Sequence, residues 1–194
     1  MAKQKNKRNK KRAQKENAII YYADEASLEL LPSVHRTYSK KGITPIIKNR
    51  CRYSKLSLIS AISERGKLIY QIRQGTFNGK AIVRFLKFLL KGKRRKIILI
   101  WDGAMVHHCK DVKQYLATLS ANRLELIKLP PYSPELNADE QVWNYLKHVQ
   151  LKNHCADNLG ALKEIAKCKL NELTQMPQII KTFFKHPDVG FINS

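Results

Sequence analysis

A short, continuous apolar run, "IILIW" at residues 97–101, limits most strongly how this chain can fold. It follows the basic segment "KRRK" and stops at Asp102-Gly103. A strand with one face in water alternates apolar and polar residues, whereas a continuous run is typical of a strand buried on both faces. Helices must then cover both sides of the strand, so the run predicts the centre of an α/β sheet.

The other segments predict a mixed sheet around this strand. Residues 17–31 begin as an apolar strand that we expect to end at Asp24, and residues 51–77 alternate on both sides of "ERGK", which predicts a hairpin. Asn78 and Gly92 are the expected ends of a helix. Further elements are expected as a strand at 124–130 and as helices at 111–121, 137–151, 157–173 and 177–185. The order predicts antiparallel pairing early in the chain and parallel crossovers later.

The chain is strongly basic. Its 194 residues include 37 Lys and Arg against 15 Asp and Glu, a net charge of +22. Residues 1–17 hold eight Lys or Arg and one Glu, and we expect them to form a basic flexible tail ahead of one domain. The positive excess extends beyond this tail and predicts a polyanionic partner, with DNA favoured over a membrane because no basic amphipathic anchor follows. Without a leader or an apolar span, a cytoplasmic, DNA-associated protein is expected.

The cysteine pattern argues against a zinc site or a disulfide framework. None of the four cysteines belongs to a C-x-x-C pair. Histidines adjoin two of them, but neighbouring residues rarely share one metal ion. The residues concerned are Cys51, Cys109, Cys155 and Cys168, with His107, His108 and His154.

Three acids stand out in this basic chain: Asp24, Asp102 and Glu140. The first two are expected at the carboxyl ends of neighbouring strands, which is where open α/β sheets build their sites. Facing carboxylates repel each other, and a shared divalent cation would relieve that repulsion. Glu25 adjoins Asp24, however, so either of this pair is also compatible with a surface position.

Purely structural explanations remain open for the same residues. Asp102-Gly103 is a common turn pair. If Asn137 caps a helix, Glu140 is its third residue and the two form a capping box. Asp139 would then favour the dipole of that helix, and Trp143, one turn after Glu140, is expected to pack in the core.

Three motifs together resemble the catalytic domain of DDE transposases, in the insertion-sequence 630 branch of the mariner superfamily. They are "YYADEASLEL", "LIWDGAMVHH" and "LPPYSPELNADEQVW", and the last is long and specific. The resemblance covers the chain from about residue 18 to its end. It implies a ribonuclease-H-like mixed sheet flanked by helices, with residues 18–194 as the DDE endonuclease catalytic domain.

The family's catalytic triad corresponds to Asp24, Asp102 and Glu140. The resemblance implies that these residues hold two Mg²⁺ or Mn²⁺ ions, with Asp102 bridging them. Such a pair of ions activates the attacking oxygen and stabilises the leaving one. His107 matches a family histidine that would orient a ligand or contact phosphate, although a structural role at a helix start also fits. The implied activity is metal-dependent DNA cleavage and strand transfer in cut-and-paste transposition.

The chain departs from the family pattern in places. Ala138 and Met105 stand where the family has proline, and only 17 residues precede the first strand, where the family carries helix-turn-helix modules. The expected partners are therefore DNA, a second copy of the chain, and a helix-turn-helix half encoded upstream. Two alternatives remain: an inactive or truncated DNA-binding fragment that regulates transposition, and a structure-specific nuclease of the same fold.

Overall fold

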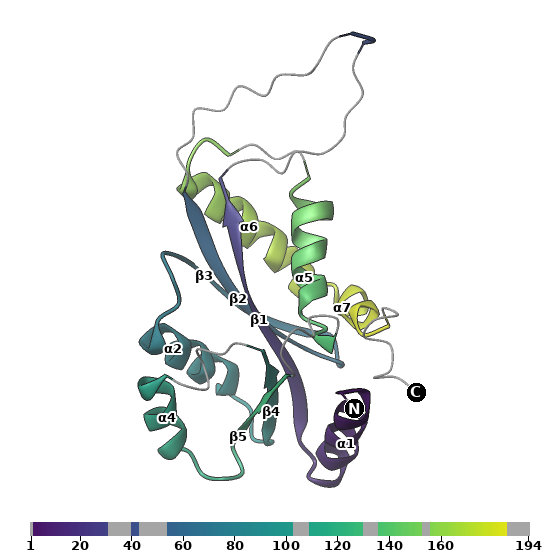
Figure 1. Ribbon diagram of the computed structural model, residues 1–194, viewed down its shortest axis with the longest axis vertical. Helices are drawn as coiled ribbons and strands as arrows, with labels where there is room; N and C mark the ends of the chain where they lie inside the picture. The colour runs from purple at the N-terminus through teal and green to yellow at the C-terminus, as the bar shows by residue number, and fades with distance from the viewer. Residues whose placement is uncertain are drawn as a thin grey trace.

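The computed structural model describes residues 2–30, 40–42, 54–102, 109–129, 136–152 and 156–185, with side chains from residue 8 onward. Within these residues the strands form one five-stranded sheet in the order β3-β2-β1-β4-β5 (Figure 1). The strands are β1 (Ile19–Glu29), β2 (Lys55–Ser63), β3 (Lys67–Gln74), β4 (Ile97–Trp101) and β5 (Leu124–Lys128).

Pairing in the sheet is mixed, as the sequence predicts. The β1–β2 and β2–β3 pairs are antiparallel, whereas β1–β4 and β4–β5 are parallel. All five residues of β4 are buried, at 0% exposure. The expectation that the continuous apolar run forms an inner strand covered on both faces is therefore confirmed.

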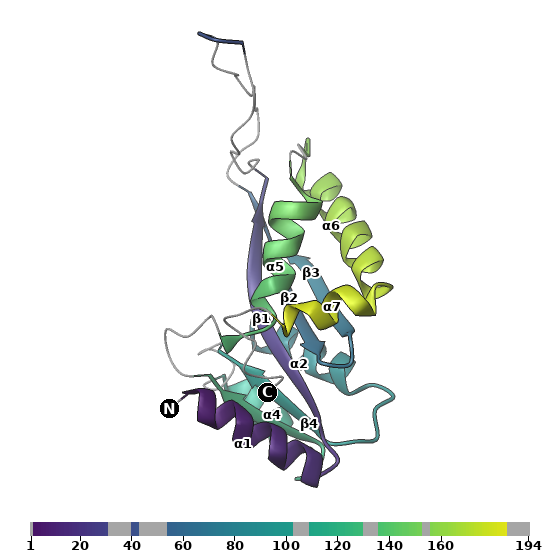
Figure 2. The ribbon, with the colours of Figure 1, turned by 90° about the vertical axis from the view of Figure 1, so that its right-hand side faces the viewer.

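Helices cover both faces of the sheet, and the alternation of side chains along β1 separates two cores. Tyr22 packs in the core beneath the last helices, whereas its neighbour Tyr21 packs beneath the earlier ones. Figures 1 and 2 show the two groups on opposite sides. The last helices are α5 (Glu140–Tyr145), the π-helical turn η2 (Leu146–Gln150), α6 (Leu159–Thr174) and α7 (Pro177–Phe183), and the earlier ones are α2 (Gly79–Leu90) and α4 (Lys110–Ala117).

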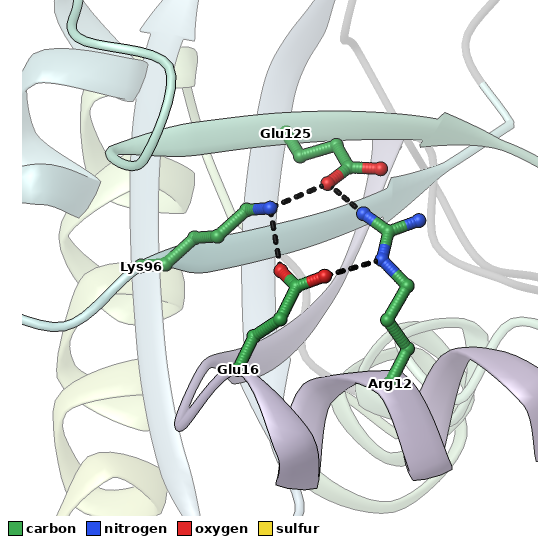
Figure 3. A network of polar contacts seen from close by, with 4 residues as sticks. All are labelled: Arg12, Glu16, Lys96 and Glu125. Carbon is green, nitrogen blue, oxygen red and sulfur yellow. Dashed lines mark hydrogen bonds and ion pairs between the residues drawn. The ribbon is translucent and has the colours of Figure 1, made fainter.

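The N-terminal segment differs from the expected flexible tail. It forms helix α1 (Ala2–Lys15), whose Ala13 is only 4% exposed. Arg12 and Glu16 join Lys96 and Glu125 in a network of ion pairs that fastens the helix to the sheet (Figure 3). A run of like charges does not favour a helix by itself. Apart from Glu16, its counter-charges are Glu64 and Glu125, which lie far along the chain and which the local sequence could not indicate.

The described helices include none that is both long and apolar enough to cross a bilayer. The N-cap predicted at Asn78 is confirmed, because its side chain accepts a hydrogen bond from the Ala81 amide at 3.0 Å. Gly92, just beyond α2, has a φ of +71°, which explains a glycine at this helix end.

Candidate active site

Asp24 lies in the middle of β1, not at its end as the sequence suggested. The strand continues to Glu29 because β2 pairs with it over its whole later half. The parallel pairing with β4 does stop beside Asp24, since Ala23 and Trp101 are its last partners. Asp24 is only 6% exposed, so it is not a surface acid, whereas Glu25 is exposed.

Asp102 is the first residue beyond β4, and it is exposed. Ala23 pairs with Trp101, and the residue that follows each of them is an aspartate. Neighbouring strands lie about 4.8 Å apart. The expected juxtaposition of Asp24 and Asp102 is therefore present in the register of the sheet.

The start of α5 is bound to β1 by Asn137. The Nδ2 of this buried side chain donates to the carbonyl oxygen of Ala23 at 3.0 Å, and its Oδ1 accepts from the Asp139 amide at 3.2 Å. The capping-box prediction is wrong, because α5 begins at Glu140 and no side chain caps it. Asn137 instead fixes the helix start next to the strand residue that precedes Asp24.

Asp139 is the site residue that sequence reasoning missed. It is fully buried, and the Oγ of Ser60 donates to its Oδ2 at 2.5 Å. Its Oδ1 is buried without a hydrogen-bond partner in the described part of the chain. Ser60 is paired with Asp24 in the sheet, so Asp139 packs over the same row of residues. Only the strand register, which the sequence does not display, would have indicated this.

Trp143 packs in the core as predicted, at 3% exposure, but it also has a polar role. Its Nε1 donates to the Asp24 Oδ2 at 3.0 Å. The indole therefore orients the carboxyl of Asp24 from within the core. One turn of α5 separates it from Glu140, the half-buried acid at the helix start.

Burial and neighbouring negative charges raise the pKa of three acids of this site, Asp24, Asp139 and Glu140. Burial, followed by the charges of Asp139, Glu140 and Asp102, raises the pKa of Asp24 to about 9. Burial also raises the pKa of Asp139, with further contributions from Glu140 and Asp102. The pKa of Glu140 is raised by burial and by Asp102, while Lys147 and hydrogen bonding to Asp24 act in the opposite direction. The three predicted acids therefore lie within electrostatic reach of one another.

The donor set fits a divalent cation in its chemistry. Carboxylate oxygens are the ligands that Mg²⁺ and Mn²⁺ prefer. Converging carboxyls with raised pKa values and a buried, unpartnered oxygen on Asp139 mark a place where added positive charge would be stabilising. Among the described residues, however, no three His, Cys, Asp or Glu side chains are already placed to hold an ion. The acids are close together without forming a finished coordination shell.

Several sequence candidates lie outside the described residues. These are Met105, His107, His108, Cys51, His154 and Cys155. The other two cysteines, Cys109 and Cys168, are free thiols.

The raised pKa of Asp24 predicts how the stability of the metal-free protein depends on pH. The folded state binds this proton more tightly than the unfolded chain, where an aspartate titrates near 3.8. The contribution of the protonated Asp24 carboxyl to the free energy of unfolding is therefore complete below that pH, and it is lost as the pH rises through about 9. In EDTA the melting temperature should fall between pH 5 and pH 9, and Asp24→Asn should flatten that fall. A melting temperature of the parent protein that is constant or rising over this range would contradict the prediction.

A family model described as DDE superfamily endonuclease matches residues 19–163. The insertion element IS630 uncharacterized 39 kDa protein of Shigella sonnei is 23% identical over 149 residues, which are 75% of this chain and 43% of that protein. This chain therefore spans less than half the length of that relative.

Solved structures share the fold. The Mos1 mariner transposase catalytic domain matches with a TM-score of 0.61 and 14% identity, over 98% of this chain and 91% of that one. The Mos1 strand transfer complex matches with a TM-score of 0.68 and 19% identity, over 100% of this chain and 61% of that one. The Mos1 mariner paired-end complex with Mn matches with a TM-score of 0.65 and 17% identity, over 100% of this chain and 62% of that one. The predicted ribonuclease-H-like fold is confirmed.

Proposed function

This chain belongs to the DDE superfamily endonuclease family, and we propose that it is the catalytic part of a transposase of the insertion-sequence 630 and mariner type. Its activity would be metal-dependent DNA cleavage followed by strand transfer. The observation that carries the proposal is the convergence of Asp24, Asp102 and Glu140, three acids from separate parts of a basic chain, at one end of the parallel β1–β4 pairing.

In this proposal Asp24, Asp102 and Glu140 hold divalent ions through their carboxylates. Bound ions would supply Lewis-acid activation of the attacking oxygen and charge stabilisation at the leaving oxygen. The exposure of Asp102 gives a phosphodiester access from solvent, while Asp24 is held from the core side. Because the carboxyl of Asp102 is exposed while those of Asp24 and Glu140 are more shielded, the scissile phosphate would approach from the side of Asp102.

Other residues of the chain would position these acids. The Nε1 of Trp143 fixes the orientation of the Asp24 carboxyl, and Asn137 fixes the start of α5 and with it Glu140. Neither residue needs to touch DNA. Positioning of this kind matters because metal-assisted catalysis depends on ligands held within a fraction of an ångström.

DNA is the proposed substrate because of both charge and site chemistry. A net charge of +22 attracts a phosphate backbone at long range. The fold of this chain is shared by the Mos1 strand transfer complex and by the Mos1 transposase paired-end complex with the left transposon end. A second copy of this chain and an upstream helix-turn-helix half remain proposed partners for recognition of element ends.

The test uses the full chain and a plasmid that carries its own gene with flanking DNA, which supplies the element ends. We expect cleavage at those ends with Mg²⁺ or Mn²⁺, none with EDTA, and joining of the freed ends to a second plasmid. Metal-dependent cleavage without joining would overturn the transposase proposal in favour of a structure-specific nuclease. DNA binding without any cleavage, also when the upstream half is added, would overturn it in favour of a regulatory DNA-binding fragment.

A further inference from the structure

Helix α1 is fastened to the sheet by a closed set of four ion pairs. The Nε of Arg12 lies 2.8 Å from Glu16 Oε1, and the Nζ of Lys96 lies 2.6 Å from Glu16 and 2.8 Å from Glu125 (Figure 3). Arg12 also pairs directly with Glu125. Burial raises the pKa of Glu125, but hydrogen bonds from Arg12 and Lys96 outweigh it and lower the pKa overall. Two acids thus neutralise two of the basic residues in this region.

These ion pairs determine which side of α1 is exposed to solvent. Ala13 is the buried contact, and Lys10 pairs with Glu64 at 3.3 Å beside it. Arg8, Lys11 and Lys15 are spaced by three and four residues, so at 3.6 residues per turn they share the face opposite Ala13. All three are exposed. Within the described part of the chain they make no ion pair.

A second basic segment adjoins the end of α1. The Nε of Arg95 donates to the carbonyl oxygen of Asn17 at 2.7 Å, which binds the α2–β4 connection to the helix end. Lys91 and Arg94 of that connection are exposed. An open hollow of about 580 Å³ lies between the two segments and is lined by Glu16, Asn17, Arg94, Arg95, Lys96 and Asn122. Arg94 of the connection and the residues that follow α1 therefore border the same hollow.

Helix α1 lies beside the first residues of β1, whereas Asp24 lies in the middle of that strand. Figure 2 shows α1 at the opposite end of the sheet from α6 and the upper part of α5. β1 starts at Ile19, directly after α1, and Asp24 follows five residues later. At about 3.3 Å per strand residue the separation is roughly 17 Å. This distance applies to the C-terminal end of α1, which directly precedes β1.

We propose that the outward face of α1 (Arg8, Lys11 and Lys15), together with Arg94 beside the end of the helix, forms a second docking surface, one that binds the phosphate backbone of duplex DNA through side chains that are not part of the acid site. The stripe on α1 is about 10 Å long. A duplex carries one negative charge per about 1.7 Å of its axis, so this length faces several phosphates. The inference rests on the proposed function only for the choice of DNA as the polyanion. The ion pairs fix the helix so that its unpaired cations face outward together.

The experiment measures the affinity of the full chain for a duplex of unrelated sequence between 50 and 200 mM salt. The variant Arg8→Gln, Lys11→Gln, Lys15→Gln should bind about tenfold more weakly, and its slope of log K against log salt should shrink by about 2 to 3, roughly 0.9 per lost phosphate contact. Adding Arg94→Gln should weaken binding further. Glutamine keeps the helix propensity of the replaced residues, so the melting temperature should not change.

The matched control is Lys87→Gln, Lys113→Gln, Lys167→Gln, which removes the same charge from α2, α4 and α6. If it lowers affinity and slope as much as the α1 variant, the effect is one of net charge and the proposal is overturned. A loss seen with vesicles of anionic lipid, but not with DNA, would overturn it as well. An α1 variant that binds weakly yet cleaves normally at saturating DNA would support it. If the parent chain never cleaves DNA, the binding result still decides this proposal separately from the proposed function.

Discussion

Asp24→Asn is expected to reduce metal-dependent DNA cleavage by at least about a thousandfold, because ligands that act together are not replaceable one at a time. Asp102→Asn and Glu140→Gln should cause similar losses. Binding of duplex DNA should be retained, since the phosphate-binding charges lie elsewhere. The measurement is single-turnover cleavage at saturating DNA, together with a binding isotherm for each variant.

The same substitution should leave the metal-free fold at least as stable at pH 8. Asparagine keeps an oxygen that can accept the hydrogen bond from Trp143, and it removes a buried carboxyl whose neighbours are also acids. Lost cleavage with an unchanged or raised melting temperature would separate a functional role from a structural one. Glu29→Gln, at the exposed end of the same strand, is the control and should alter neither property. Full cleavage by Asp24→Asn would remove Asp24 from the catalytic set.

Asn137→Ala is expected to destabilise the fold by about 2 kcal/mol and to slow cleavage. It leaves the buried carbonyl of Ala23 and the amide of Asp139 without their partner, and unmade buried hydrogen bonds cost about 1–3 kcal/mol. For a chain of this size the melting temperature should fall by roughly 6 °C. Cleavage should slow at temperatures where the variant is folded, since the start of α5 and Glu140 lose their tie to β1.

Asn158→Ala supplies a matched comparison. Asn158 caps α6 by accepting from the Ala161 amide at 2.9 Å, and it is exposed. Loss of such a cap costs about 1 kcal/mol. Cleavage by this variant should remain at the parent rate when the protein is folded. If Asn137→Ala and Asn158→Ala affect cleavage equally, the proposed positioning by Asn137 is wrong.

The features that the sequence predicted correctly depend on local patterns. The run at 97–101 is a buried inner strand because nothing in it can face water, and Asp102 follows it directly. The alternation around "ERGK" likewise predicts the β2–β3 hairpin. Each of these inferences needs only neighbouring residues, so a single sequence is sufficient for them.

The features that were missed depend on pairs of residues far apart in the chain. Asp139 can be buried because the hydroxyl of Ser60 donates a hydrogen bond to it. Asn137 holds the start of α5 against β1 because its side chain donates to the carbonyl oxygen of Ala23. Both residues also have ordinary local explanations at a helix start, and these explanations were the natural ones to expect. Helix α1 follows the same rule, since its counter-charge Glu125 lies on a distant strand.

The shared level of Ala23 and Trp101 has a consequence for insertions and deletions. The position of the two aspartates is set by main-chain pairing between β1 and β4, so one extra codon inside either strand would shift one acid past the other. In β1 it would also turn the carboxyl toward the wrong side, since successive residues alternate. An extra codon at the exposed turn after β3, by contrast, changes no pairing between these strands. We therefore expect the effect of an insertion or deletion to depend on whether it falls within the paired residues of β1 and β4. The number of residues between the insertion and the acids should matter less.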